Sequence, residues 1–194
     1  LLSLSSGGVC LEWWRKNLTV ASDGSLIPFD VINEEVAKRK AAEDGLFFYP
    51  FSGNAAPDRK FQKASFIGLD LSHDRFDIAR AIMEGVAFQA IWMMESFKTK
   101  PSKEGLKLAG GASKSALWCQ MVADIANLPV RIPEVADLAC VGAAIMAGTG
   151  CGIYSNVEEG YKRLAVRERV IYPDPARAQM YAKLYAEYKK CAGM

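Results

Sequence analysis

Histidine, the side chain behind many general bases and metal sites, is almost missing from this chain. The 194 residues include one histidine, His73, and five scattered cysteines that form no C-x-x-C pair. This composition argues against a metal site held by the protein and against a disulfide framework, so we expect reduced thiols in a cytoplasmic protein. It also leaves His73 as the only histidine base for Ser-His-Asp or Cys-His catalysis. Because His73 stands between two helix-capping candidates, Ser72 and Asp74, we interpret it as a surface neighbour of a helix start.

Long apolar runs and strong charge are lacking as well. No apolar run approaches the length that spans a membrane, and we expect no secretory signal. A net charge of +2, without a basic stripe that carries interleaved aromatics, argues against a nucleic-acid binder. The chain is 51% hydrophobic and 24% charged, which is typical of one globular domain with a substantial core. It opens on Leu1-Leu2 without a methionine, so we expect a piece of a longer polypeptide.

Glycines and apolar runs divide the chain into alternating strands and helices. We predict strands at 1–5, 46–51, 64–71, 106–109 and 128–132. We predict helices at 9–18, 31–43, 74–97, 138–149, 157–165 and 174–191, with a further one directly after the glycine pair at 110–111. Strands come first and strand–helix alternation follows, which favours an α/β domain of three layers with a mixed sheet flanked by helices.

Three of these helices carry specific expectations. Asp30 is expected to cap the helix at 31–43, and Gly45 to terminate it. The helix at 138–149 is almost wholly apolar, so we expect it to be buried, with its glycines allowing close packing. The final helix carries an aromatic face that either packs on the core or forms a dimer contact, and periodicity does not distinguish these two.

The stretch at 106–125 is the most informative part of the chain. A short apolar run from Leu106 to Ala109 predicts a buried strand, which stops at Gly110-Gly111 and is followed by an amphipathic helix. Two glycines between a strand and a helix bring bare backbone and a helix N-terminus to one point, where a flat or anionic ligand can approach closely. Taken alone, such a pair is more often a tight turn without a ligand.

The chain shares longer motifs with a known family. One is Ala64–Leu69, followed after seven residues by the Asp77–Gly85 helix segment, and another is Ala109–Ser115 with Trp118, Gln120 and Asp124. The others are Cys140–Ala144 through Tyr154 and, less specifically, Ser6–Gly8 through Trp14. These motifs span nearly the whole chain, which resembles the C-terminal domain of the FGGY family of carbohydrate kinases, on the side of the family that holds xylulokinase and gluconokinase.

This resemblance implies an actin-like, ribonuclease-H-like ATPase fold. Residues 1–194 would form the C-terminal, nucleotide-binding domain of a two-domain sugar kinase whose active cleft lies between the domains. ATP, with Mg²⁺, would lie mainly on this domain and the sugar mainly on the N-terminal domain, which is absent from the chain. The family's catalytic aspartate and first phosphate loop belong upstream, so we assign no catalytic residue and no metal ligand, and we expect no turnover by this chain alone.

The resemblance also assigns the cofactor-binding residues. Gly110, Gly111 and Ala112 would form a flat platform for the adenine and ribose, and Ser115 would contact the purine edge. Without the resemblance, Ser115 is as readily an ordinary first-turn helix serine. Lys114 is interpreted as a solvated lysine rather than a phosphate clamp, because the family motif does not require a cation there. Glu84 is expected to make a structural hydrogen bond.

The substrate prediction is a ketopentose such as D-xylulose. Many relatives carry an acidic-Pro-x-Ala-Arg-Gly stretch before the second strand, whereas residues 58–64 are one residue shorter here and end in Lys63-Ala64. A second hypothesis is a non-catalytic, regulatory or scaffolding nucleotide-binding module of the same fold. A dinucleotide-dependent oxidoreductase fits poorly, because Gly-Gly-Ala-Ser is not G-x-G-x-x-G. A sugar substrate and a homodimer are the predicted partners, with no nucleic acid and no membrane.

Overall fold

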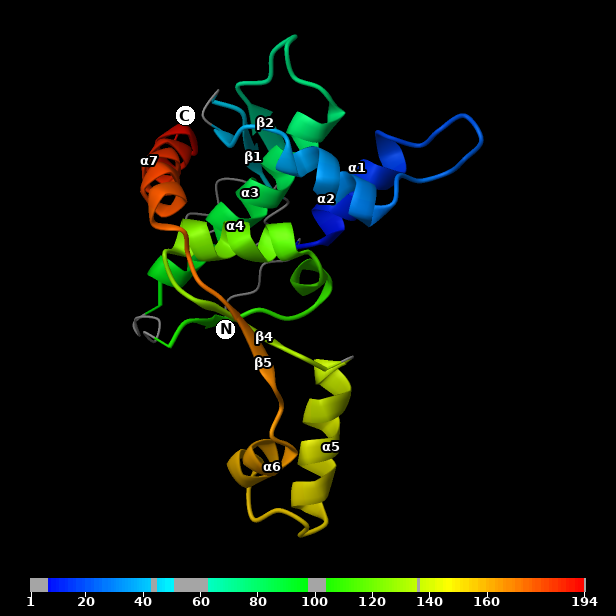
Figure 1. The fold of residues 1–194 in the computed structure, drawn as a ribbon, viewed down its shortest axis with the longest axis vertical. Helices are drawn as coiled ribbons and strands as arrows, with labels where there is room; N and C mark the ends of the chain where they lie inside the picture. The colour runs from blue at the N-terminus through cyan, green and yellow to red at the C-terminus, as the bar shows by residue number, and fades with distance from the viewer. Residues whose placement is uncertain (1–6, 43–44, 51–62, 98–103, 136, 194) are drawn as a thin grey trace.

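The computed structural model describes residues 7–42, 45–50, 63–97, 104–135 and 137–193, and Figure 1 shows their arrangement. The elements in chain order are α1 (Val9–Asn17), α2 (Phe29–Ala37), β1 (Phe47–Tyr49), β2 (Ser65–Ile67), α3 (Arg75–Glu95), β3 (Leu106–Lys107), the 3-10 turn η2 (Gly111–Lys114), α4 (Ala116–Ala126), β4 (Val130–Pro133), α5 (Leu138–Gly150), α6 (Val157–Leu164), β5 (Glu168–Ile171) and α7 (Pro175–Cys191). Helices α1 to α4, helix α7 and the β1–β2 pair form a main body. Strands β4 and β5 lead from that body to α5 and α6, which project from one end of it.

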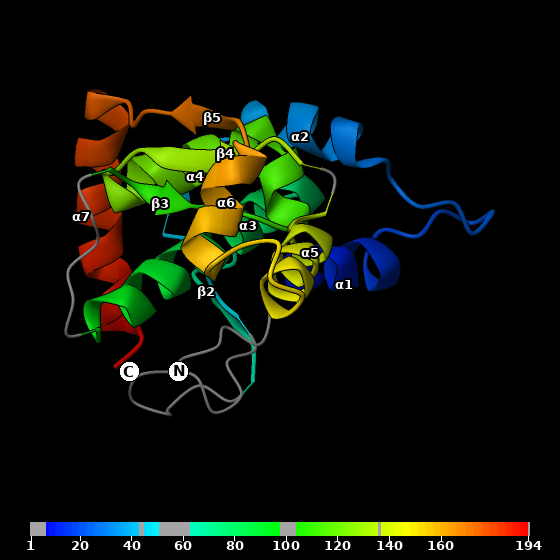
Figure 2. The same ribbon diagram turned by 90° about the horizontal axis from the view of Figure 1, so that it is seen from below.

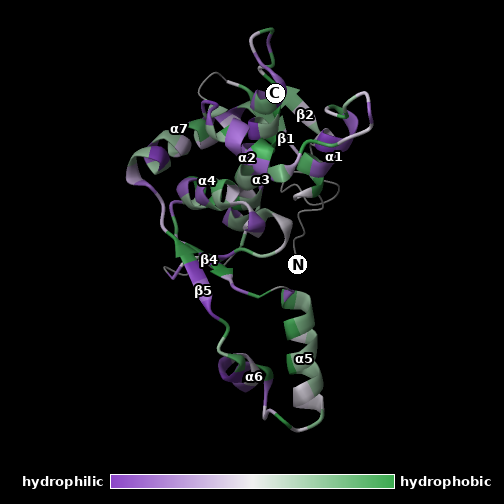
Figure 3. Cartoon of the chain, turned by 45° about the vertical axis from the view of Figure 1, so that its right-hand side comes forward, coloured by the Kyte–Doolittle hydropathy of each residue, from purple (hydrophilic) through white to green (hydrophobic). Residues whose placement is uncertain are grey.

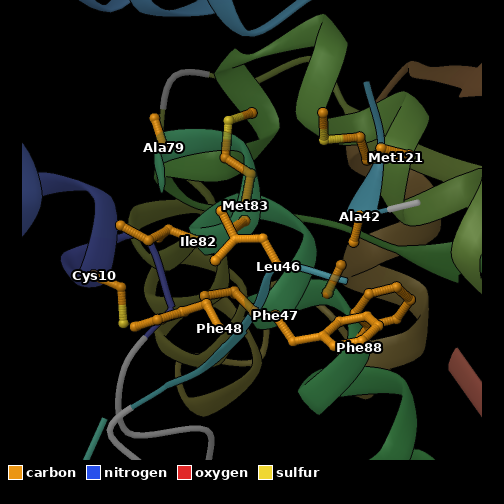
Figure 4. Packing of buried hydrophobic residues seen from close by; sticks show 14 of the residues in the cluster. Cys10, Ala42, Leu46, Phe47, Phe48, Ala79, Ile82, Met83, Phe88 and Met121 are labelled. Carbon is orange, nitrogen blue, oxygen red and sulfur yellow. The ribbon is translucent and has the colours of Figure 1, made fainter. Parts of the chain in front are cut away.

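The main hydrophobic core surrounds α3. This helix contacts β1, α1, α2 and α4, and α7 packs on α4. Ile82, Met83 and Phe88 of α3 are fully buried beside Phe48 of β1, as Figure 4 shows. The aromatic face of α7 completes this cluster. Its buried side chains there are those of Tyr181, Leu184 and Tyr188. The final helix therefore packs on the core, one of the two roles that its periodicity allowed.

The start of α3 follows standard capping chemistry. Asp74 is the N-cap: its side chain accepts from the N–H groups of Phe76 and Asp77, and the Asp77 carboxylate accepts from the Asp74 N–H, completing a capping box. The capping role expected of Asp74 is confirmed, whereas the Ser72 hydroxyl donates to Asp70 at 2.6 Å instead. The surface position expected of His73 is wrong, since its side chain is only 2% exposed and its Nδ1 accepts the Asp70 N–H at 3.0 Å.

Two small sheets lie in the described part of the chain. Strands β1 and β2 pair antiparallel, with Phe48 opposite Phe66. The second sheet has the order β3–β4–β5, with β3 parallel and β5 antiparallel to β4, and Figure 2 shows the three strands side by side. The mixed sheet was expected, but β5 was not predicted, because its residues alternate weakly and half of them are charged. Ion pairs of Glu168 with Lys107 and Arg131 link β5 to the other two strands.

Two expectations about helices are wrong. Helix α2 begins at Phe29 with Pro28 as N-cap, so Asp30 lies inside its first turn, and it ends at Ala37, well before Gly45. The physical reason is that Pro28, with φ −61° and an extended ψ of 149°, stands just outside the helix, which begins directly after it without a capping side chain.

The second correction concerns burial of α5. Only Ile145 and Gly148 of this apolar helix are buried, and Met146 is 64% exposed. Among the described elements, α6 is its main neighbour, and Figure 3 shows α5 standing clear of the body with its apolar colouring exposed. Gly148 does approach closely, since an added Cβ would meet the Tyr154 ring, whereas Gly142 faces open space. An apolar sequence predicts that other elements bury the helix on all sides, but the described part of the chain covers only one side of α5.

Candidate functional site

The glycine pair forms an open turn between β3 and α4. Gly110 adopts φ 87° and ψ −161°, a conformation that L side chains rarely reach, and Gly111 to Lys114 then form the 3-10 turn η2. The Ser113 hydroxyl donates to the Gly110 carbonyl at 2.7 Å, which ties the turn to its own start. Gly110, Gly111 and Lys114 are exposed, so this turn lies at the surface of the protein.

Neither glycine is required by packing inside the protein. A Cβ built on Gly110 or on Gly111 would meet no atom within 4 Å. Gly110 is explained by its positive φ, but Gly111 has ordinary backbone angles, so its missing side chain leaves free surface rather than avoiding a clash. Free surface above bare backbone is what close approach of a ligand needs.

An apolar hollow lies on one side of the turn. It has a volume of about 400 Å³ and is lined by residues from α1, α2, η2 and α4, namely Gly8, Leu11, Phe29, Asn33, Gly111, Lys114, Ser115 and Trp118. The Trp118 indole N–H donates to the Met83 carbonyl at 2.9 Å. Because its one polar group is used in this way, the ring offers only apolar surface to the hollow. Such a hollow suits a flat aromatic ligand with a polar edge.

A second, more polar hollow lies on the other side of the turn. It has a volume of about 870 Å³ and is lined by Ala109, Gly110, Gly111, Ser113 and Lys114 together with residues 132–135 and 137–139. Because β3 and β4 run parallel, the loops that follow them meet at one edge of the sheet, which is where ligands bind in open α/β folds. Gly111 and Lys114 line both hollows, so one elongated ligand could pass over this turn and fill both.

The charges in the polar hollow are mixed. Lys114 lines this hollow together with two acidic residues, Glu134 and Asp137. The N–H groups of Cys140 and Ala139 donate to Asp137 and hold its pKa below the usual range, so this carboxylate stays ionised as the N-cap of α5. Lys114 is exposed, as expected for a solvated lysine. An anionic ligand here needs additional positive charge from outside this group.

Ser115 occupies a different position from the one expected. It is the N-cap of α4, with extended backbone, and not a residue of the first helical turn. Its Oγ accepts the backbone N–H of Trp118 at 3.1 Å and donates to Asn33 Oδ1 at 2.7 Å. The reason for the difference is the 3-10 turn, which delays the start of the α-helix until Ala116.

Sequence reasoning missed the wall of the apolar hollow that α1 and α2 supply. Phe29 and Asn33 stand four residues apart on α2 and therefore share one face of it, and both line the hollow. The i, i+4 spacing of Phe29 and Asn33 was the available signal in the sequence. It did not reveal the hollow, because a helix with polar residues on all sides does not indicate which of its faces lies against another element.

Two further motif residues have structural tasks. The buried Asp124 carboxylate accepts from Arg177 Nε at 2.6 Å and from the Asp174 N–H at 2.8 Å, which fixes the start of α7 against α4. Glu84 accepts from Arg80, Tyr181 and the Ala42 N–H. Burial raises the pKa of Glu84, while these donors oppose that shift. The structural hydrogen bond expected of Glu84 is confirmed.

The described side chains include no group of three or more His, Cys, Asp or Glu placed to hold a metal ion. Within the described ranges, every helix is too short or too polar to cross a membrane.

The fold is an α/β domain of the kind found in actin-like ATPases. The family model for the FGGY family of carbohydrate kinases, C-terminal domain, matches residues 3–151. The chain therefore belongs to the FGGY family, and within it to the C-terminal domain.

Individual relatives agree with this assignment. The chain is 33% identical over 188 residues to the L-xylulose/3-keto-L-gulonate kinase of Escherichia coli K12, covering 95% of this chain and 36% of that protein. It is 27% identical over 194 residues to the autoinducer-2 kinase of Klebsiella pneumoniae, covering 94% of this chain and 36% of that protein. The chain thus spans little more than a third of the curated relatives it matches.

Solved structures share the fold. The ligand-bound xylulose kinase of Lactobacillus acidophilus superposes with a TM-score of 0.78 at 24% identity, covering 96% of this chain and 38% of that one. The glycerol kinase of Plasmodium falciparum with ADP superposes with a TM-score of 0.73 at 23% identity, covering 96% and 37%. The actin-like fold predicted from the sequence is confirmed.

Proposed function

We propose that this chain is the ATP-binding half of a carbohydrate kinase that transfers the γ-phosphoryl group of ATP to a sugar hydroxyl. The observation that carries the proposal is the open Gly110–Gly111 turn, which separates an apolar from a polar hollow in a member of this family. A nucleotide has the matching shape, with a flat aromatic base at one end and anionic phosphates at the other.

The apolar hollow suits the adenine base. Trp118 and Leu11 supply apolar surface, and Phe29 supplies an aromatic ring. Gly110, Gly111 and Ala112 form the platform over which the ribose passes, and the missing Cβ of Gly111 leaves room for it. Ser115 completes the polar edge of this site.

The polar hollow suits the phosphates, provided that a cation accompanies them. Two carboxylates, Glu134 and Asp137, and one lysine line it, so the site by itself repels a polyphosphate. A Mg²⁺ ion carried by the phosphates would supply that charge, in keeping with its preference for phosphate and water oxygens. Phosphoryl transfer relies mainly on positioning and electrostatics, and this half contributes by holding the nucleotide.

The catalytic base and the sugar contacts belong to an N-terminal domain outside this chain. The family and the fraction of its relatives that the chain covers support this domain arrangement. We infer a cytoplasmic enzyme that acts on a ketopentose such as D-xylulose. The relatives' names also bring L-xylulose, 3-keto-L-gulonate and autoinducer-2 into the test panel.

The test is ADP release by the longer polypeptide, with Mg-ATP, across these sugars, D-gluconate, L-ribulose and glycerol. Turnover of one of them establishes the kinase and names its substrate. Silence across the panel from a folded protein that still binds ADP would instead favour the non-catalytic module.

The site itself is tested by Gly111→Val. The added side chain enters open space in the protein but blocks the platform, so we expect the fold to persist while ADP affinity falls at least tenfold. Gly142→Val is the matched control, because Gly142 also faces open space and lines neither hollow. Isothermal titration with Mg-ADP measures both. Equal affinities for the two variants would refute the placement of the nucleotide.

A further inference from the structure

The apolar hollow contains an amide whose hydrogen-bonding capacity is only partly used. Asn33 lies on α2, is partly buried, and lines the hollow opposite the turn. Its Oδ1 accepts the Ser115 hydroxyl, and its Nδ2 makes no hydrogen bond with any residue in the described part of the chain. An amide offers two donor hydrogens and two acceptor lone pairs, so Asn33 has capacity left at both ends.

The orientation of this amide is determined by α4. The Ser115 side-chain oxygen accepts the backbone N–H of Trp118, because it caps the helix. The hydroxyl proton of Ser115 is then free to be donated, and Oγ donates it to Oδ1 of Asn33 over an oxygen–oxygen distance of 2.7 Å. A hydroxyl that donates selects the oxygen end of the amide, which leaves the NH₂ end for another acceptor.

Ser115 itself has little left to offer a ligand as a donor. Its single proton is used by Asn33, so it cannot donate to a ring nitrogen of a purine while this pair is intact. The other polar side chain in the hollow, Lys114, carries only donors and cannot accept from an exocyclic amino group. Asn33 is therefore the side chain here that can both donate and accept.

We propose that Asn33 selects adenine over 6-oxopurines, with Ser115 as the positioning residue that orients its amide. This inference rests on the proposed nucleotide site. The second lone pair of Oδ1 accepts the adenine 6-amino group, and Nδ2 donates to the ring nitrogen beside it, which is the pairing that an amide makes with adenine. Hypoxanthine has a carbonyl oxygen at the 6-position in place of the amino group. This oxygen would face Oδ1 of Asn33, and the two acceptors would repel each other because neither carries a proton.

The test compares Mg-ADP with Mg-IDP binding to the chain by isothermal titration. We expect the wild-type protein to bind ADP about tenfold or more tightly than IDP. Asn33→Asp is the sharpest variant, since it has the same shape and still accepts from Ser115 but lacks the donor. Its ADP affinity should fall about tenfold, with the ADP-to-IDP ratio approaching one. Ser115→Ala should lower the ratio by about threefold, because the amide loses its orientation while its chemistry remains.

Asn17→Ala is the matched control, because Asn17 is an exposed asparagine that bonds the Trp13 carbonyl and lies outside the hollow. Its ratio should equal that of the wild type. Equal wild-type affinity for ADP and IDP, or an equal loss of both in Asn33→Asp, overturns the role of Asn33 while the nucleotide site stands. Absence of binding by either nucleotide to the wild-type chain overturns the site itself, and the role of Asn33 with it.

Discussion

At the scale of single residues, glycines serve two opposite purposes in this protein. Gly85 lies against β1, where an added Cβ would clash with the carbonyl group of Phe48. Gly111 lies beneath open space, where an added Cβ meets nothing. The first glycine allows two elements to pack, and the second leaves surface for a ligand, although both look alike in the sequence.

Gly85→Ala is expected to destabilise the protein by about 2–3 kcal/mol, because backbone must shift where the helix meets the strand. Chemical denaturation measures this as a lower free energy of unfolding. Gly142→Ala is the control: it adds the same methyl group to an open helix surface and should be neutral or slightly stabilising. A Gly85→Ala variant as stable as the wild type would show that α3 and β1 can separate without cost.

At the scale of elements, β5 is held by charge rather than by apolar alternation. The Glu168 side chain is 9% exposed and accepts from Arg131 Nε at 2.6 Å and Lys107 Nζ at 2.9 Å. These two cations, with Tyr161, lower the pKa of Glu168 to about 2. One carboxylate thus joins all three strands of the mixed sheet, a link that no local pattern reveals.

This arrangement predicts a pH dependence. A lowered folded-state pKa contributes stability that is present above the ordinary value of 4.5 and is lost as the pH falls toward about 2. We expect Glu168→Gln to cost about 1 kcal/mol at pH 7, since Lys107 and Arg131 remain partly solvated.

Denaturation curves at pH 7 and pH 3 provide the measurement. The difference between the variant and the wild type should shrink at the lower pH. The exposed pair of Glu158 and Lys162 is the control, and Glu158→Gln should change little at either pH. A difference that is independent of pH would contradict the role assigned to Glu168.

At the scale of the whole molecule, α5 and α6 present apolar surface away from the body. The exposed side chains include Met146 at 64%, Ile153 at 62% and Val157 at 48%. Exposed apolar side chains that gather in one region bind apolar dyes and promote association more than ones scattered singly over the surface. The 194-residue chain is therefore expected to bind such a dye.

Met146→Lys should lower that dye fluorescence by about half, because it places a charge in the middle of the exposed helix face. Leu71→Lys is the matched control: Leu71 is fully exposed and far from α5 in the chain, so its replacement should have a smaller effect. Equal effects of the two substitutions would show that the dye does not bind at α5.

Much of the architecture could be predicted from sequence periodicity. The long helix α3, its Asp74 cap, the α4 helix after the glycine pair and the apolar β1 strand all follow from local spacing and capping chemistry, which act within a few residues. Family motifs indicated the glycine turn and the fold. The site residues Gly110, Gly111, Ala112 and Ser115 remain a proposal, which the hollows around them support.

The sequence by itself determined most of the elements, the open turn and the family, because these depend on short-range patterns. Only the tertiary structure decided three things: that Ser115 caps α4 and bonds Asn33, that β5 joins the sheet through Glu168, and that α5 stays exposed. Each joins residues distant in the chain, or depends on which surfaces the rest of the chain covers, and no local pattern encodes such contacts.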